Sequence, residues 1–209
     1  GGWRVLAALG IKPEVCHLNE GHTAFAALER IRVYAESHNT NFEEARWATR
    51  VGNIFTSHTP VAAGFDRFAP GLVTQYLQEY AHALQIPLEQ LIGLGQITPE
   101  ESESFNMANL AIRLCGTVNG VSRLHGEVSQ RLFQPLFTNW PQTEIPIGHV
   151  TNAVHTPSWD SSTADRLWTD TCGKERWLGT LGTLRKDIEA VPDETLRASR
   201  SEGRNNFIP

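Results

Sequence analysis

The chain has 209 residues, of which 40% are hydrophobic and 20% charged, values that are typical of a globular domain and exclude a disordered chain. The formal net charge is −5 without a basic block, and no apolar run approaches a bilayer-spanning length, so binding to nucleic acid or membranes is disfavoured. The three cysteines are far apart and form no C-x-x-C pair, which argues against a disulfide framework and favours a reducing, cytoplasmic setting.

Helical and extended patterns alternate along the chain. The opening, GGWRVLAALG, reads as the inside of a helix without a methionine or a signal peptide, so we expect a piece of a longer protein. In chain order the patterns predict helix 3–9, strand 14–19, helices 23–39 and 41–51, strand 53–58, helices 70–84 and 105–116, strand 117–122, helix 123–133, and a strand with a turn within 147–159. The segment 93–104 reads as polar and turn-rich.

This order predicts an α/β fold with a Rossmann-like parallel sheet and flanking helices. We expect it to occupy residues 1–159 and to be followed by a helical, charged segment, 160–209. Two helices have clear apolar faces, each with helical spacing. The faces consist of Ala24, Ala27, Leu28, Ile31 and Ala35 in the first helix, and of Val73, Tyr76, Leu77, Tyr80 and Leu84 in the second.

Every predicted strand ends in polar residues, in the stretches HLNEGH, TSHTP, VNGVS and HVTNAVH. In an open parallel sheet, the loops beyond the carboxyl ends of the strands form the ligand crevice. His, Asn, Glu, Ser and Thr offer both donors and acceptors of hydrogen bonds, which suits a polyhydroxy ligand such as a sugar. Asn119-Gly120 and Asn152-Ala153 are also turn signals.

The first of these stretches contains the pattern H-x-x-E-x-H, from His17 through Glu20 to His22. Its spacing differs from the helical zinc motif H-E-x-x-H, and the segment leaves a strand, so we expect no metal site. His17 is alternatively a satisfied core histidine, with Asn19 and Thr23 capping the next helix.

The second stretch places His58 after a strand and before Thr59-Pro60. Because Pro60 keeps the preceding residues out of a helix, the backbone carbonyl and the imidazole of His58 can both face the crevice. A buried histidine bonded to a neighbouring loop is the alternative.

Four ordered motifs together resemble the α-glucan (glycogen/maltodextrin) phosphorylases. They are HLNEGHTAFAALERI, FTSHTPVAAGFDRF, NMANLAIRLCGTVNGVSRLHGEVSQ and HVTNAVHTPSW. The resemblance implies part of the N-terminal domain of a GT-B glycosyltransferase, which has two Rossmann-like domains facing a cleft. It also implies reversible phosphorolysis of terminal α-1,4-linked glucose of glycogen or maltodextrin, giving glucose 1-phosphate.

The resemblance further implies roles for four residues. His58 would be the catalytic histidine that contacts the glucosyl residue at the cleavage subsite, partly through its backbone carbonyl. Asn152 would bond the 6-hydroxyl of the sugar, and Glu20 and His22 would line a pocket beside the anomeric carbon. These are positioning and electrostatic roles.

The implied cofactor is pyridoxal phosphate, bound as a Schiff base on a lysine whose phosphate-binding neighbours lie in the family's C-terminal domain. Lys12, Lys174 and Lys186 lie in no comparable motif, so we expect that lysine outside this chain and the isolated chain to be inactive. Three positions depart from the family pattern: Ala153 replaces the glycine of T-N-G, and Ala62 and Phe65 replace a proline and a histidine.

The expected partners are the α-1,4-glucan or maltodextrin, phosphate and the C-terminal domain, with self-association into a homo-oligomer left open. Three other functions remain open at this point. One is the acceptor domain of a nucleotide-sugar GT-B glucosyltransferase of the glycogen synthase type, which would share the fold. The others are a non-catalytic glucan-binding module, which would need a surface strip of aromatic residues, and a metal-dependent hydrolase.

Overall fold

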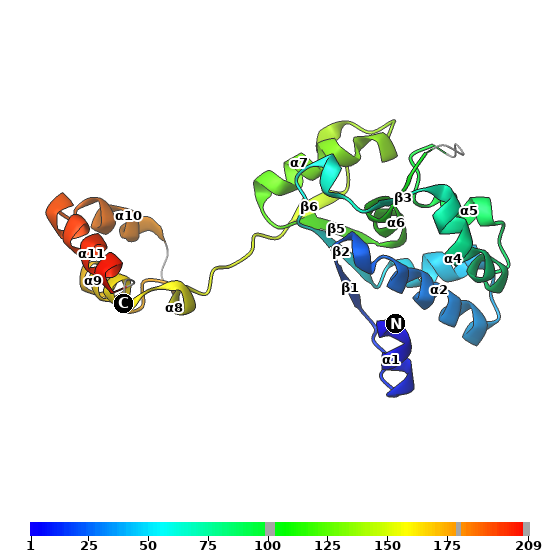
Figure 1. The fold of residues 1–209 in the computed structure, drawn as a ribbon, viewed down its shortest axis with the longest axis horizontal. Helices are drawn as coiled ribbons and strands as arrows, with labels where there is room; N and C mark the ends of the chain where they lie inside the picture. Colours follow the sequence, from blue (N-terminus) through cyan, green and yellow to red (C-terminus); the bar gives the residue numbers. More distant parts are fainter. Residues whose placement is uncertain (99–102, 179–180, 207–209) are drawn as a thin grey trace. The chain divides into compact units, whose positions relative to one another are not determined.

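The computed structural model describes residues 1–98, 103–178 and 181–206. These divide into two compact units, Gly1–Asn152 and Ala153–Pro209, which we describe separately (Figure 1). The first unit contains all of the described strands, and the described part of the second unit is helical.

The main sheet of the first unit is parallel, as the alternating order predicts. Its strands are β1 (Cys16–Asn19), β2 (Asn53–Ser57), β5 (Thr117–Gly120) and β6 (Ile147–His149). They lie in the order β1-β2-β5-β6 (Figure 1). Each predicted strand is therefore present, and the α/β prediction is confirmed.

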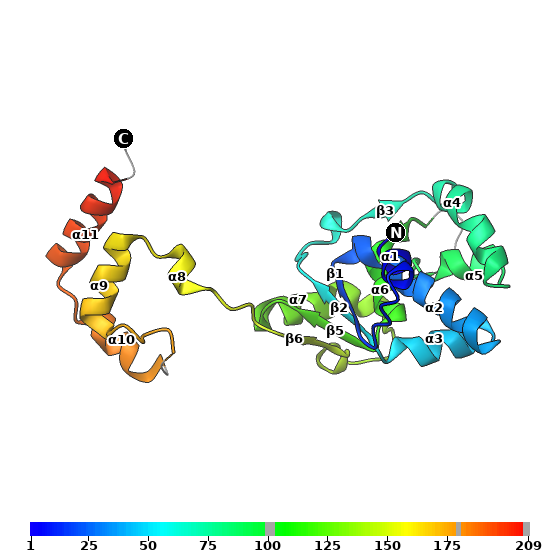
Figure 2. The same ribbon diagram turned by 90° about the horizontal axis from the view of Figure 1, so that it is seen from below.

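The helices of the first unit connect and cover these strands. They are α1 (Gly2–Ala8), α2 (Phe25–His38), α3 (Phe42–Arg50), α4 (Pro70–Ala83), α5 (Leu88–Gly93), α6 (Met107–Leu114) and α7 (Arg123–Phe133). Figure 2 shows α2 and α3 side by side, while α6 packs against β2 and α7 against β5 and β6. Several helices begin at a side chain that accepts a backbone N–H, as Asn41 does for α3, Asn106 for α6 and Ser122 for α7.

One face of the sheet supplies the core. Leu18, Phe55, Val118 and Ile147 are aligned by the register of the parallel strands. All four are at most 7% exposed and belong to the same buried cluster as the apolar residues of α2 and α6. Burying each such side chain is worth roughly 1.5–3 kcal/mol relative to leaving it exposed. The core therefore holds the strands in a fixed register, which fixes where their carboxyl ends lie.

A buried carboxylate joins three helices of the unit. Glu29 on α2 accepts hydrogen bonds from Arg4 Nε of α1 at 2.8 Å, from Arg32 Nη2 at 2.7 Å and from the Tyr80 hydroxyl of α4 at 2.5 Å. Burial alone would raise the pKa of Glu29, but these three donors outweigh it and hold the pKa at about 2. Burial of the phenol raises the pKa of Tyr80, and its bond to the same carboxylate raises it further.

The structure differs from the sequence predictions in several details. Three elements were not predicted: helix α5 and the short antiparallel strands β3 (Arg67–Phe68) and β4 (Phe105–Asn106). Because β4 occupies residues 105 and 106, α6 begins at Met107, two residues later than the predicted helix 105–116. Tyr76 is 72% exposed rather than buried, because on α4 it lies at the flank of the stripe that buries Val73 and Leu77. Within the predicted turn-rich segment, residues 99–102 lie outside the described residues.

Asn119-Gly120 was predicted as a turn, and this is wrong. Both residues belong to β5 and pair with β2 and β6. A Cβ atom at Gly120 would lie 2.7 Å from His125 Nδ1 and 2.9 Å from the Gly126 nitrogen. The glycine is therefore explained by the close approach of α7 to the strand rather than by chain reversal.

The second unit contains α8 (Thr156–Trp159), α9 (Ser162–Cys172), α10 (Leu181–Glu189) and α11 (Asp193–Asn205). Its helical character agrees with the sequence pattern. Arg176, whose side chain is 6% exposed, lies 2.7 Å from Asp160 and 2.8 Å from Asp165, and so ties the segment after α9 to the start of that helix.

Candidate functional site

The candidate site of the first unit lies at the carboxyl edge of the main sheet. Because all four strands are parallel, the residues that follow them emerge at one edge. Glu20 follows β1, His58 follows β2, and Asn152 comes three residues after the end of β6. Adjacent strands are about 4.8 Å apart, so β1 and β6 are separated by roughly 14 Å. This span is wide enough for an extended ligand to lie across the strand ends.

Glu20 and His58 are in direct contact. Glu20 Oε2 accepts a hydrogen bond from the backbone nitrogen of His58 at 2.7 Å and one from Thr59 Oγ1 at 3.3 Å. The same oxygen lies 3.5 Å from His58 Nδ1. The imidazole of His58 is 39% exposed, so it is not the buried histidine of the alternative interpretation.

The backbone of Glu20 is strained, with φ at 73°. Its amide nitrogen donates to Thr56 O at 2.9 Å, which continues the pairing of β1 with β2, and its carbonyl accepts from Thr23 Oγ1 at 2.7 Å. A left-handed conformation costs a residue other than glycine about 1–3 kcal/mol, and it persists only where neighbouring contacts hold it. Such strain is typical of residues at functional sites.

His22 lies on the 3₁₀ turn Gly21–Thr23 that follows Glu20, and its side chain is exposed. The carboxylate of Glu20 accepts from the nitrogen of Gly21 at 3.2 Å and so caps this turn. From the sequence, the alternative was that Asn19 and Thr23 cap a helix that starts near Thr23. That expectation is wrong: Glu20 caps the 3₁₀ turn, and α2, which begins at Phe25 with Ala24 at its N-cap, has no side-chain cap.

Asn152 is held at the same edge by backbone bonds to the segment after β5. Its amide nitrogen donates to Val121 O at 3.0 Å, and that of Val150 donates to Gly120 O at 3.0 Å. The side chain of Asn152 is exposed. The chain after β6 thus stays paired for three further residues, which places Asn152 beyond the strand end beside Val121.

A series of side-chain hydrogen bonds runs across β1, β2 and β5, before the ends of these strands. His17 Nε2 lies 2.7 Å from Thr56 Oγ1, and Thr56 Oγ1 donates to Asn119 Oδ1 at 3.0 Å. Since the Thr56 hydroxyl donates its single proton to Asn119, His17 Nε2 carries a proton and donates to Thr56. His17 is therefore a satisfied histidine but not a core one, because it is exposed on the sheet surface.

The sequence patterns did not indicate that Thr56 and Asn119 are partners. Both are buried, and the strand register places them side by side. Alternation within each strand signals which face they share, but only the pairing of strands far apart in the chain brings them together.

The H-x-x-E-x-H pattern does not form a cluster. His17 bonds across the sheet to Thr56, whereas Glu20 turns towards the loop after β2. Within residues 1–98, 103–178 and 181–206, no group of three or more His, Cys, Asp or Glu side chains is arranged to hold a metal ion.

The packing of the loop after His58 accounts for Phe65, which stands where the family pattern has a histidine. Phe65 is 8% exposed and packs on Phe133 of α7, with ring centroids 5.1 Å apart. It thus points into the core, and Ala62 lies in the short 3₁₀ turn Ala62–Gly64. Phe65 therefore contributes packing rather than a ligand contact to this loop.

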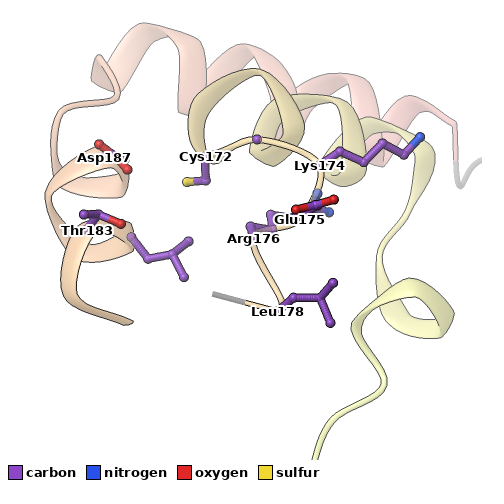
Figure 3. Close-up of a pocket in the computed structure, with 9 residues that line it drawn as sticks. Cys172, Lys174, Glu175, Arg176, Leu178, Thr183 and Asp187 are labelled. Carbon is purple, nitrogen blue, oxygen red and sulfur yellow. The ribbon is translucent and has the colours of Figure 1, made fainter. Parts of the chain in front are cut away.

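A separate pocket of about 520 Å³ lies in the second unit (Figure 3). It is lined by Cys172 at the end of α9, by the segment that follows, including Arg176, and by Thr183 and Asp187 of α10. Figure 3 shows the side chain of Lys174 extending away from the hollow. Arg176 is already paired with Asp160 and Asp165, so its charge serves the fold of this unit. The pocket contains none of the four predicted site residues.

The described part of the chain has no helix that combines the length and the apolar character needed to span a membrane. The cysteines, Cys16, Cys115 and Cys172, are all free thiols.

Comparison with known proteins identifies the family. The family model described as carbohydrate phosphorylase matches residues 11–206. The maltodextrin phosphorylase of Thermococcus litoralis is 39% identical over 209 residues, which cover 100% of this chain and 24% of that protein. The glycogen phosphorylase of Mycobacterium tuberculosis (strain H37Rv) is 40% identical over 153 residues, covering 70% of this chain and 18% of that protein.

The glycogen phosphorylase of Aquifex aeolicus is 30% identical over 193 residues, covering 92% of this chain and 27% of that protein. The matched segments thus span between 18% and 27% of the length of these relatives. Since the family model covers nearly the whole chain, and the fold carries the polar strand ends of the resemblance, the chain belongs to the carbohydrate phosphorylase family.

Proposed function

We propose that this chain forms one wall of the active site of an α-glucan phosphorylase, a GT-B glycosyltransferase that reversibly releases glucose 1-phosphate from glycogen or maltodextrin with phosphate. The observation that carries the proposal is the convergence of Glu20, His58 and Asn152 on one edge of a parallel sheet in a member of this family. The relatives compared above are named maltodextrin or glycogen phosphorylase, and no observation favours a nucleotide-sugar transferase or a non-catalytic module.

Each residue has a distinct role in this proposal. His58 is the catalytic residue: its imidazole contacts the glucosyl residue, and its backbone carbonyl faces the sugar carbon that becomes positively charged as the glycosidic bond breaks. A carbonyl dipole held in place beforehand stabilises such a charge without reorganisation. Asn152 holds the sugar through a hydrogen bond to a hydroxyl group, and His22 lines the pocket beside the anomeric carbon. Their exposed side chains leave these polar groups accessible to a ligand.

The cofactor implied by the family is pyridoxal phosphate, which when bound supplies a phosphate group for proton transfer. The lysines of this chain do not fit its attachment. Lys12 precedes β1, Lys174 and Lys186 lie in the second unit, and all three are exposed to solvent rather than enclosed in a site. We therefore place the attachment lysine in a part of the protein outside this chain, and we assign no step to this chain's lysines.

The same proposal covers the domain organisation. Residues 1–159 would form the Rossmann-like part of the N-terminal domain, and residues 160–209 would lead towards the second domain of the GT-B cleft. The strands of the main sheet end before Asn152, and the regular elements described after it are helices, which supports a division in this region; the compact units themselves divide between Asn152 and Ala153, so α8 belongs to the second unit. We expect the whole enzyme to be cytoplasmic, consistent with its free thiols.

Phosphorolysis of maltodextrin by the full-length protein tests the proposed function. The wild-type protein is expected to release glucose 1-phosphate from maltodextrin and phosphate, and to show the absorbance of bound pyridoxal phosphate. His58→Ala and Asn152→Ala should each lower kcat/KM at least about 10-fold, the loss of roughly 1.4 kcal/mol of transition-state stabilisation. The isolated chain should neither release glucose 1-phosphate nor bind pyridoxal phosphate.

Glu144→Gln is a suitable control, because Glu144 is in the turn Gln142–Glu144 before β6, at the opposite end of that strand from Asn152. Glucosyl transfer from a nucleotide sugar without phosphorolysis would refute the proposal in favour of a synthase. Full activity of both site variants would refute the assigned roles.

A further inference from the structure

We propose that Glu20 is a positioning residue that holds the turn at His58 and Thr59 in place, and acts on the sugar through His58 rather than by touching it. This inference rests on the proposed function, because it assigns the turn a role in the reaction. It follows from the way in which the carboxylate of Glu20 is used within the chain.

The carboxylate faces donors of its own protein. Oε2 accepts from the backbone nitrogen of His58 and from the hydroxyl of Thr59, and Oε1 accepts from the nitrogen of Gly21. Its side chain is 22% exposed, so only part of it is open to solvent. With both oxygens engaged, Glu20 joins the end of β1 to the turn that follows β2.

The backbone of Glu20 is fixed on both sides. Its nitrogen donates to Thr56 O of β2, and its carbonyl accepts from the hydroxyl of Thr23. These bonds keep φ at 73°, a conformation that a glycine would adopt without strain. The strained backbone aims the side chain at the neighbouring strand end, where the turn begins.

The turn at His58 has few other restraints. Thr59 N donates to Ser57 Oγ at 3.3 Å, and Pro60 has no N–H to donate. The bond of 2.7 Å from the His58 nitrogen to the charged carboxylate of Glu20 is shorter than the bonds of 3.3 Å that Thr59 makes, which makes it a strong restraint on this turn. Fixing that nitrogen fixes the peptide plane before His58 and, with it, the direction of the residue that follows.

The carboxylate also orients the imidazole. Because Glu20 Oε2 lies 3.5 Å from His58 Nδ1, it favours a proton on that nitrogen. In the neutral ring Nε2 is then an acceptor that can receive a hydrogen bond from a sugar hydroxyl. Glu20 thereby sets both groups of His58 that the proposed function uses.

Two variants of the full-length enzyme separate positioning from stability. Glu20→Gly removes the carboxylate and relieves the strain of the positive φ, which offsets part of the lost hydrogen bonds, so the variant should still unfold in one cooperative thermal transition close to that of the wild type. Glu20→Gln keeps the size of the side chain but weakens the bond to the His58 nitrogen. We expect kcat to fall about 10-fold or more in both variants, with KM for maltodextrin changed less than about threefold, because the ground-state contacts remain.

A second measurement does not depend on activity. Hydrogen–deuterium exchange of the His58 amide in the same full-length enzyme should be at least about 10-fold faster in Glu20→Gly than in the wild type. Glu36→Gln is the matched control, since Glu36 lies at the far end of α2 with a side chain that is 58% exposed. It should change neither kcat nor the exchange of this amide.

The outcomes distinguish this proposal from the proposed function. If the wild type releases glucose 1-phosphate and Glu20→Gly keeps kcat within about twofold, Glu20 does not position the turn. A rise in KM at constant kcat would instead make Glu20 a direct substrate contact and overturn the inference. If the wild type shows no phosphorolysis, the proposed function fails, and unchanged exchange at His58 in Glu20→Gly would separately reject the restraint.

Discussion

Replacing Glu29 by glutamine tests how much the buried carboxylate between α1, α2 and α4 stabilises the first unit. Glutamine keeps the volume of the side chain and one acceptor oxygen, but it removes the charge that Arg4, Arg32 and Tyr80 surround. The variant therefore leaves two guanidinium groups and a phenol with a weaker acceptor. The expected result is a loss of stability that depends on pH.

The size of this loss follows from the pKa of Glu29, which lies at about 2 instead of its ordinary 4.5. At about 1.4 kcal/mol for each pKa unit, the ionised carboxylate would contribute roughly 3 kcal/mol. The side chain of Arg4 is 66% exposed, so solvent screens part of this interaction and we expect about 2 kcal/mol. Such a loss would lower Tm by roughly 4–8 °C for a unit of this size.

The pKa is lowered by folding, so the contribution is fully present above pH 4.5 and is lost as the pH falls towards 2. The difference between wild type and Glu29→Gln should therefore shrink from about 2 kcal/mol at pH 7 to about 1 kcal/mol at pH 3. Urea unfolding followed by tryptophan fluorescence at the two pH values measures it.

Glu36→Gln on the same helix is the control, because it removes the same charge from an exposed partner of Arg32 and should cost less than about 0.5 kcal/mol. The reasoning is refuted if Glu29→Gln is no less stable than Glu36→Gln at pH 7. An equal loss at both pH values would also refute it, because the charge would then not be the cause.

Two further substitutions test the packing that positions the site. Gly120→Ala should destabilise the first unit by about 2 kcal/mol or more in urea unfolding, because the added Cβ would lie 2.7 Å from His125 Nδ1. Gly148→Ala is the control and should cost less than about 1 kcal/mol, because the nearest atom to its Cβ is 4.0 Å away. Equal urea midpoints for the two variants would contradict this reasoning. Asn53→Ala should cost about 2–3 kcal/mol in the same assay, because the fully buried side-chain amide of Asn53 donates to the carbonyl of Leu114 and accepts from Arg30, each at 2.9 Å. An unchanged midpoint would show that water replaces the lost amide group.

The local patterns of the sequence were sufficient for the strands of the main sheet, for most of the helices and for the fold class, but not for α5 or the short strands β3 and β4. Ala27, Leu28 and Ile31 are buried as their helical spacing predicts, because a 3.6-residue period leaves only one face of α2 to the core. The alternation of strands and helices predicted a parallel sheet, and polar residues after each strand predicted a crevice at its carboxyl edge. The helical spacing wrongly predicted that Tyr76 is buried, because this residue lies at the edge of the apolar stripe and is exposed to solvent.

The contacts within the site were decided by the tertiary structure. The sequence placed Glu20 and His58 after two strands, but it carried no information on strand order, which makes β1 and β2 neighbours. Nor did it show that Glu20 adopts a left-handed backbone, which depends on its bonds to Thr56 and Thr23. Asn119-Gly120 carries the local signal of a turn, yet pairing with β2 and β6 on both sides makes it a strand. Local patterns report the preferences of nearby residues, whereas these features arise from hydrogen bonds between residues far apart in the chain.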